Sequence, residues 1–481
     1  MVLDPCVYLP DETKVDGSEG GLLTFTECCL PDNKLYNILE HIYFAENATV
    51  NVWEISAMGR QSTQESSSIT ETHYVVGRRG KTDGGTLTLG RYYALDGSLG
   101  AQVFLDVTRP HVVFICGKRG YGKSYSIGVL LEEICRLKDV VRERLGVIVV
   151  DTLGVFWTMH FPNVAEKTQL ARGGSEPQGF PVRLLVPMKT VAEFRQQSID
   201  AVSFSLRVAS VSAAHWCHLF GVKSTDPISI TLSRAVLSMQ ARSDCFSIHD
   251  LVVRIQQDDR ASDLVKTAAE NFLAVADSWK IFNAKGLAVT DLVKRGVVSI
   301  LDLSSLPSQP LKDVVVSLIS EAIFEAQVQA RRAYEEEKVG LMTETAGLPL
   351  VWLAVDEAQV FIPRDHDTLS KEVLLTEWMR QGRQPGLSLI LATQRPSALE
   401  PEVLSHADII VCHRLTAQED IDMLGLVRPT YMRGDIAESI KKMGDEKGVA
   451  LLVDDTSESV HVIKVRPRMS RHGGGEPEII L

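Results

Sequence analysis

Eight consecutive residues carry the clearest chemical pattern in this sequence, because Gly117-Lys-Arg-Gly-Tyr-Gly-Lys-Ser124 fits G-x-x-x-x-G-K-[ST] in full. Glycines in such a loop let the backbone turn its N–H groups toward anionic oxygens, and the helix that follows adds its partial positive charge. Lys123 is predicted to reach the β- and γ-phosphates of ATP, and the Ser124 hydroxyl is predicted to hold Mg²⁺. The alternative is a glycine-rich turn with an incidental lysine. We expect the following residues to bind the nucleotide: Gly117, Gly120, Gly122, Lys123, Ser124 and Tyr125.

An apolar strand followed by two carboxylates is the second candidate for chemistry. The segment Leu350–Val355 leads directly into Asp356 and Glu357. Asp356 is predicted to hold Mg²⁺, and Glu357 is predicted to orient or deprotonate the attacking water. Taken alone, the pair also fits a strand that ends in a solvated acidic turn. Its combination with the phosphate-binding loop favours ATP hydrolysis.

Two further polar groups complete the candidate site. Leu387–Thr393 is an apolar strand followed by Gln394, whose amide can contact the γ-phosphate, although an isolated amide here also fits a loop role. Arg380 and Arg383 stand three residues apart at a predicted helix end or turn. An arginine from a neighbouring subunit can neutralise charge on the γ-phosphate, so this pair predicts a site shared between subunits. The alternative for both arginines is a solvated or salt-bridged helix end.

Strands and helices alternate around these motifs. Helical spacing of apolar residues predicts helices at Ser124–Lys138 and Asp313–Lys338, and mainly helices from about residue 205 to 295. The alternation predicts an α/β fold with a mostly parallel sheet covered by helices on both faces. Its strands are expected at His111–Cys116, Gly146–Val150, Val297–Leu303, Pro349–Val355 and Leu387–Thr393.

The two ends of the chain differ from this central pattern. Residues 1–80 contain short strand-like pieces and a polar Ser/Thr/Gln-rich stretch at Gly59–His73, so we expect a small β-rich domain there. Residues 469–481 include a glycine-rich run and are expected to form a flexible tail.

Composition bounds the class of protein. The 481 residues are 45% hydrophobic and 23% charged, which is ordinary for a globular protein. The formal net charge of −12 argues against a protein that coats DNA, but a ring can still place basic residues on an inner surface. The eight cysteines form no C-x-x-C pair, which suits a reducing cytoplasm. We see no secretory signal and no long apolar run, so we expect a cytoplasmic protein without a membrane span.

Taken in order, the motifs resemble those of the HerA-like ATPases, hexameric DNA translocases of the HerA–FtsK group. The resemblance covers roughly residues 85–468, and many P-loop enzymes share only its first motif. It rests on Leu89-Gly-Arg91, Gly117–Ser124, Arg295–Ser304, Asp356-Glu357, Arg380-Gln-Gly-Arg383, Leu387–Pro396 and Arg414–Asp420.

The resemblance implies a RecA-like P-loop motor domain at 85–468, with a helical insertion at about 200–290. It also implies a homohexameric ring that threads double-stranded DNA. Arg383 becomes the first candidate for the arginine that acts on a neighbouring subunit, and Arg380 and Arg414 are further candidates. The remaining roles are carried over by position to Lys123, Ser124, Asp356, Glu357 and Gln394.

Three positions depart from the family pattern. Gln359 closes the acidic motif where the family often has His, and Tyr121 occupies a loop position that is usually small. Val155 stands where the family commonly has Glu. A Tyr121 side chain that faced the nucleotide would weaken its binding.

The same residues fit more than one function. The first is an ATP-driven translocase or helicase on double-stranded DNA that works with a nuclease or another effector in DNA end processing or phage defence. The alternative is an ATP-controlled oligomeric scaffold that assembles and activates an effector, such as a nuclease or a sirtuin-like subunit, without translocating. A pump related to the conjugation ATPases is disfavoured by the lack of a membrane segment.

Overall fold

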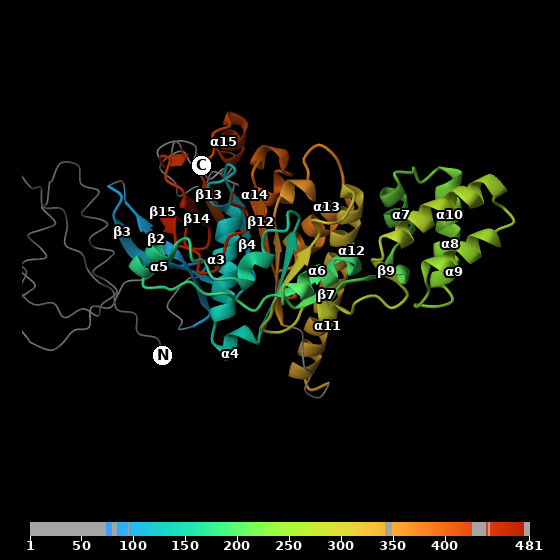
Figure 1. Cartoon of the computed structure of the whole chain (residues 1–481), viewed down its shortest axis with the longest axis horizontal. Helices are drawn as coiled ribbons and strands as arrows, with labels where there is room; N and C mark the ends of the chain where they lie inside the picture. The colour runs from blue at the N-terminus through green and yellow to red at the C-terminus, as the bar shows by residue number, and fades with distance from the viewer. Residues whose placement is uncertain are drawn as a thin grey trace, which may run out of the picture. The chain divides into compact units, whose positions relative to one another are not determined.

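The computed structural model describes residues 74–78, 84–94, 96–341, 349–425, 439–440 and 443–475 (Figure 1). The chain divides into two units between Thr70 and Glu71, and every described residue lies in the second. The β-rich domain expected at residues 1–80 therefore lies outside the described residues except for 74–78. That short segment contains β1, which pairs with β3 of the main sheet.

A 13-stranded sheet organises the described residues, in the order β1-β3-β2-β15-β14-β13-β4-β12-β11-β5-β10-β6-β7. Neighbouring strands from β13 to β7 are parallel, whereas β13, β14, β15, β2 and β3 pair antiparallel. The predicted α/β fold with a mostly parallel sheet is confirmed. The strands are β1 Tyr74–Val76, β2 Thr86–Tyr93, β3 Leu99–Asp106, β4 Val112–Cys116, β5 Leu145–Asp151, β6 Arg183–Val186, β7 Ala201–Ser203, β10 Val298–Asp302, β11 Leu350–Val355, β12 Leu387–Thr393, β13 Ile409–His413, β14 Val449–Asp454 and β15 Ser459–Val465.

Helices cover both faces of the central strands. In β4, Val113 and Ile115 join one hydrophobic cluster while Phe114 and Cys116 join the other, as the alternation of side chains along a strand requires. Helix α3, Lys123–Arg136, packs into the first cluster, and α12, Gln309–Lys338, packs into the second. Burial on both sides explains why these strands read as nearly continuous apolar runs. Other helices are α4 Asp139–Arg142, α5 Lys167–Arg172, α6 Val191–Gln196, α11 Val289–Leu292, α13 Leu369–Val373, α14 Glu402–His406 and α15 Gln418–Gly425.

Four helices gather between β7 and β10 in the region where a helical insertion was expected (Figure 1). A short parallel pair, β8 Leu206–Arg207 with β9 Phe282–Asn283, brackets them. Side chains tie this group to α12, because His218 on the first of the four helices pairs with the buried Asp313 at 2.9 Å. The helices are α7 Ala213–Phe220, α8 Pro227–Gln240, α9 Ile248–Gln256 and α10 Asp263–Ser278.

A buried charged cluster fixes the start of β4, the strand that leads to the phosphate-binding loop. His111 Nδ1 lies 2.6 Å from Asp408 Oδ2, and His111 Nε2 lies 3.6 Å from Asp106 Oδ2. Asp408 Oδ1 also accepts the Val112 N–H at 2.7 Å. Burial alone lowers the pKa of His111, but the hydrogen bonds and charges of Asp106 and Asp408 outweigh it and raise the pKa to about 9.

This cluster makes stability depend on pH in a defined direction. Because the folded pKa of His111 is above the ordinary value of about 6.5, its contribution is fully present below that value and is lost as the pH rises through about 9. We expect His111→Asn to lower the free energy of unfolding by up to about 3 kcal/mol at pH 6 and much less above pH 9. Urea unfolding across this range measures the difference, with His366→Asn at an exposed pair with Asp365 as the control. A deficit that does not vary with pH contradicts the prediction.

Candidate active site

The phosphate-binding loop joins β4 to α3, as its sequence predicts. Gly122 caps α3 with φ 125°, a backbone conformation that favours glycine, and no side chain occupies the cap. The N–H groups of the first turn of α3 are therefore available to an anionic ligand. A Cβ on Gly117 would lie 2.6 Å from the Cβ of His413, so the loop needs glycine there to pack on β13.

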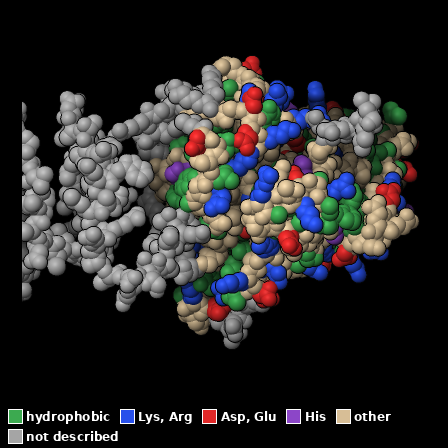
Figure 2. All heavy atoms as spheres, turned by 60° about the vertical axis from the view of Figure 1, so that its left-hand side comes forward, with side chains coloured by type: hydrophobic (Ala, Val, Ile, Leu, Met, Phe, Trp, Pro, Cys, Tyr) green, Lys and Arg blue, Asp and Glu red, His purple; other side chains and the backbone are tan. Residues whose placement is uncertain are grey.

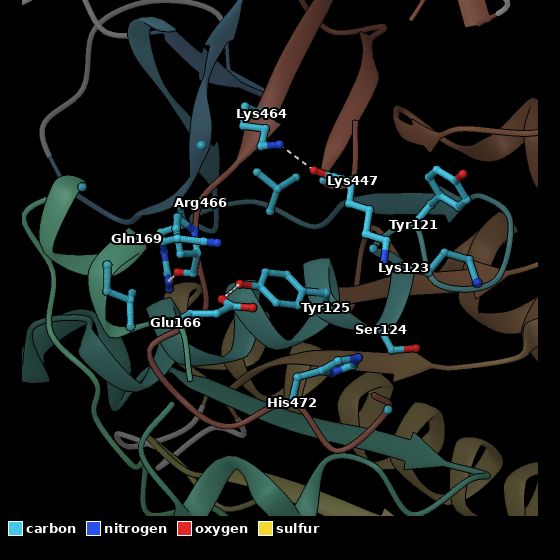
Figure 3. A pocket seen from close by; sticks show the side chains of 18 of the residues that line it. Tyr121, Lys123, Ser124, Tyr125, Glu166, Gln169, Lys447, Lys464, Arg466 and His472 are labelled. Carbon is cyan, nitrogen blue, oxygen red and sulfur yellow. Dashed lines mark hydrogen bonds between the residues drawn. The ribbon is translucent and has the colours of Figure 1, made fainter. Parts of the chain in front are cut away.

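Lys123 is the cation of this loop, and its side chain is almost fully buried. Burial lowers the pKa of Lys123, and the nearby carboxylates of Glu357 and Asp356 only partly oppose this effect. In Figure 3 the Lys123 side chain points into the cavity, with Ser124 close by. A phosphate group would supply the negative charge that this partly desolvated ammonium lacks.

Ser124, in the first turn of α3, contacts Asp356 at the carboxyl end of β11, and the two residues form the candidate metal site. Ser124 Oγ donates a hydrogen bond to Asp356 Oδ2 at 2.8 Å. Asp356 is fully buried, and burial together with the charge of Glu357 raises its pKa to about 6. A hydroxyl beside a buried carboxylate that lacks full compensation is an oxygen donor set that suits a hard cation such as Mg²⁺. The two residues predicted to hold Mg²⁺ therefore fit it.

Glu357 lies next to this pair with both carboxylate oxygens hydrogen-bonded. Its Oε1 accepts from Gln394 Nε2, and its Oε2 accepts from Gln359 Nε2 at 2.7 Å. The backbone of Glu357 has φ 55° and ψ 47°, a left-handed conformation that is uncommon for residues other than glycine. Such conformations cluster at functional sites. The structure thus brings together Glu357 and Gln394, which lie 37 residues apart in the sequence.

Asp151 ends β5, the strand beside β11, and Val155 lies in the turn that follows it. Both carboxylate oxygens of Asp151 accept backbone N–H groups of the following turn, from Leu153, Gly154 and Phe156. Burial raises the pKa of Asp151 to about 7, with the charges of Asp302 and Asp356 adding to the effect. Asp151 therefore shapes the turn, and it leaves Leu153 and Val155 as apolar lining of the cavity.

Tyr121 does not obstruct the loop. Its ring is turned away from Lys123 and Ser124 (Figure 3) and lies 5.8 Å from the guanidinium of Arg414. Arg414 also pairs with Asp445 and donates to the Gly444 carbonyl at 2.8 Å. The resemblance made Arg414 a candidate for the arginine that acts on a neighbouring subunit. In the structure Arg414 lies against the phosphate-binding loop of its own chain.

The other two arginines lie away from the cavity of their own chain. Arg380 ends the π-helical segment Leu374–Met379 and forms a two-point ion pair with Glu402, at 2.6 and 2.8 Å. Arg383 is exposed on the following turn, and it makes no ion pair with any described residue. An exposed and unpaired guanidinium is available to a second subunit, whereas that of Arg380 is already engaged.

Tyr125 follows the loop and lines the cavity, but it is committed to contacts within the protein. Its hydroxyl donates to Glu166 Oε2 at 2.6 Å and accepts the Arg468 N–H at 2.6 Å. Its predicted part in nucleotide binding is therefore limited to the surface of its ring.

Two features around the loop were missed by the sequence analysis. His413, at the end of β13, lies beneath the loop, where its ring bonds Ser126 Oγ at 2.8 Å and the Val449 carbonyl at 3.0 Å. Burial lowers the pKa of His413 to about 4, so the ring is neutral. Nothing in the local sequence marks this histidine, because its partners are distant in the chain.

The second missed feature is the segment 466–472, which runs along α3. Glu132 of α3 is fully buried and pairs with Arg466 at 2.9 Å and with the buried Arg468 at 3.4 Å. It also accepts the Ser470 N–H at 2.8 Å. The prediction of a flexible tail from residue 469 is therefore wrong for the described part, because buried charges and backbone hydrogen bonds hold it in place.

These elements enclose a cavity of about 1630 Å³. Lys123, Ser124, Glu357 and Gln394 lie on its wall, and residues of α5, β2, β15 and the segment that follows β15 also line it. The volume exceeds the roughly 300–1,000 Å³ typical of small-molecule sites, so it can hold a nucleotide with space to spare.

A glycine loop at a helix start, facing carboxylates at the ends of neighbouring parallel strands, defines the P-loop class of nucleotide-binding proteins. Comparison with known proteins narrows the class. The model of the family described as helicase HerA, central domain, matches residues 89–323. Over these residues the chain is similar to the HerA family of P-loop ATPases.

Individual relatives are distant. The DNA double-strand break repair helicase HerA of Pyrococcus furiosus is 29% identical over 178 residues, which are 34% of this chain and 31% of that protein. The protein of the same name from Saccharolobus solfataricus is 24% identical over 373 residues, 76% of this chain and 66% of the relative. The match thus spans less than two thirds of either relative. Among solved structures, VirB4 of Thermoanaerobacter pseudethanolicus aligns at 16% identity with a TM-score of 0.48, over 81% of this chain and 98% of that one.

None of the helices in the part of the chain that the structure describes has both the length and the apolarity needed to cross a membrane.

Proposed function

We propose that this chain hydrolyses ATP and couples hydrolysis to movement along double-stranded DNA as a homohexameric ring, working with a nuclease or another effector in DNA end processing or phage defence. The observation that carries the hydrolysis step is the contact chain from Ser124 through Asp356 and Glu357 to Gln394. It joins the ends of two strands, β11 and β12, to the loop that follows β4, which is the arrangement that phosphoryl transfer to water needs.

The chain's own residues account for the chemistry. The N–H groups of the loop and Lys123 hold the phosphates, while Ser124 and Asp356 would hold Mg²⁺, which supplies positive charge against the phosphate oxygens when bound. Glu357 takes a proton from water as the water oxygen bonds to the γ-phosphorus. The bond from that phosphorus to the bridging oxygen breaks, and ADP and inorganic phosphate result.

Movement on DNA is supported by similarity, because the relatives above are named DNA double-strand break repair helicases. A shared site is supported by the exposed Arg383, since the described chain leaves its guanidinium unpaired while the cavity has room for a further group. A homohexameric ring would bring one subunit's Arg383 to the next subunit's cavity.

A second function is favoured by the distribution of charge. On the face shown in Figure 2, Lys and Arg are interspersed with Asp and Glu, and the whole chain carries a net charge of −12. An ATP-controlled scaffold that assembles an effector, such as a nuclease or a sirtuin-like subunit, needs no basic path for DNA.

Two measurements on the purified chain test these functions. We expect ATP turnover that blunt duplex DNA stimulates, and ATP-dependent displacement of a third strand from a triplex placed along that duplex. Turnover without displacement favours the scaffold. Absence of turnover at saturating Mg²⁺ and ATP, with and without DNA, rules out both the translocase and the hydrolytic site.

A further inference from the structure

Gln359 and Gln394 each donate a hydrogen bond to one carboxylate oxygen of Glu357. The two glutamine side chains differ in the other contacts that they make. Gln359 is fixed at both ends of its amide. Its Nε2 donates to Glu357 Oε2 at 2.7 Å, and its Oε1 accepts from Thr393 Oγ1 at 2.7 Å. Thr393 is fully buried at the end of β12, so Gln359 ties the acidic turn after β11 to the neighbouring strand.

Gln394 has the opposite character. Among the described residues its side chain bonds only Glu357, and it lines the cavity together with Glu357 and Lys123. Gln359 does not line the cavity. A ligand that enters the cavity can therefore reach the amide of Gln394 without disturbing that of Gln359.

The exchange of one amide has a chemical consequence. A γ-phosphate oxygen beside Lys123 would be, like the Glu357 carboxylate, an ionised acceptor for the Gln394 N–H, so the amide can exchange one charged partner for another. When Gln394 turns to that oxygen, Glu357 keeps its position through Gln359 but loses one donor.

We propose that Gln359 is a positioning residue that holds Glu357 through Thr393, and that Gln394 is an exchangeable partner that leaves Glu357 for the terminal phosphate of ATP. The inference rests on the proposed ATP hydrolysis. It gives Gln359 a role of its own and links the hydrogen-bond partner of Gln394 to the presence of a γ-phosphate.

The Gln359 half is tested by steady-state hydrolysis. We expect Gln359→Leu to lower kcat by about 10- to 100-fold with KM for ATP changed less than about 2-fold, because misplacing the base costs rate and not binding. Gln359→His, which keeps a ring N–H, should recover most of the loss, and Thr393→Val should lower kcat by a smaller factor. The matched control is Gln256→Leu, which removes an amide–carboxylate pair with Glu270 in the insertion, at 2.8 Å, and should behave as wild type.

The Gln394 half is tested by binding, which does not depend on turnover. Wild type should bind a non-hydrolysable ATP analogue more tightly than ADP, and Gln394→Leu should lose about 10-fold of that preference while binding ADP normally. Thermal unfolding of each variant checks that it folds, and Gln359→His serves where Gln359→Leu does not.

The outcomes distinguish the roles of the two glutamines from ATP hydrolysis itself. Wild-type hydrolysis with an unchanged kcat in Gln359→Leu, or equal rates for the Leu and His variants, overturns the role of Gln359 and leaves the proposed function intact. An unchanged preference for the ATP analogue in Gln394→Leu overturns the exchange. A wild type that binds ATP but never hydrolyses it overturns the proposed function together with this inference.

Discussion

Replacing Glu357 by glutamine is expected to lower kcat for ATP hydrolysis by about 10²- to 10⁴-fold, the usual contribution of a positioned general base. The substitution removes the proton acceptor while keeping the shape and hydrogen-bonding size of the side chain. Lys123, Ser124 and Asp356 stay in place, so the Kd for ATP should change only a few-fold. Single-turnover hydrolysis and nucleotide titration on the same preparation measure the two quantities.

The control for this substitution is Glu400→Gln, which removes a carboxylate that pairs with Lys371 at 2.9 Å and does not line the cavity. Its turnover should match that of wild type. A Glu357→Gln variant that retains more than about a tenth of the wild-type rate would mean that another group accepts the proton.

Replacing Arg383 by alanine is expected to lower kcat by about 10³-fold or more, which is the lower end of the effect of an arginine donated to a phosphoryl-transfer site. The side chain is exposed and lies outside the cavity of its own chain, so it can act only on the site of another copy. Stability should be nearly unchanged because no ion pair is lost among the described residues.

Mixing two inactive variants distinguishes action between subunits from action within one. Arg383→Ala keeps an intact loop, and Lys123→Ala keeps an intact Arg383. Each mixed boundary that joins the intact loop of one copy to the intact arginine of the other should hydrolyse ATP, so activity should reappear on mixing. No recovery in verified mixed assemblies contradicts the shared site. Arg380→Ala is the comparison, and it should lose less because Arg380 is already paired with Glu402.

The sequence could predict those parts of the site that follow from strand ends. In parallel strands the carboxyl ends meet at one edge of the sheet, so Asp356 after β11 and Gln394 after β12 had to lie near the loop after β4. The apolar runs and helical spacing also placed α3 and α12 within a few residues. These predictions rest on local patterns, which is why they could be made from the sequence alone.

The rest depended on contacts between distant parts of the chain. His413 supports the loop only because β13 lies beside β4, and neither its residue type nor its neighbours distinguish it. Arg468 precedes a glycine-rich run in the sequence, with no local sign of burial, yet it lies fully buried against Glu132. Gln359 looked like a departure from a family pattern, and only the position of Thr393 reveals what its amide contacts.

The ion pairs and hydrogen bonds between α3 and residues 466–472 have a consequence for synthesis of the protein. The contact between Glu132 and Ser470 spans 338 residues of chain. At about 5–20 residues per second, a ribosome needs roughly 20–70 seconds to make the intervening chain. The phosphate-binding loop has emerged at the start of this interval, whereas the acidic strand and the glutamine strand are made during it and the buried Arg468 only at its end. The nascent chain therefore lacks the complete nucleotide site during its early folding. The exposed edge of β4 must also wait for β12 and β13, so we expect a chaperone to have most to protect at this stage.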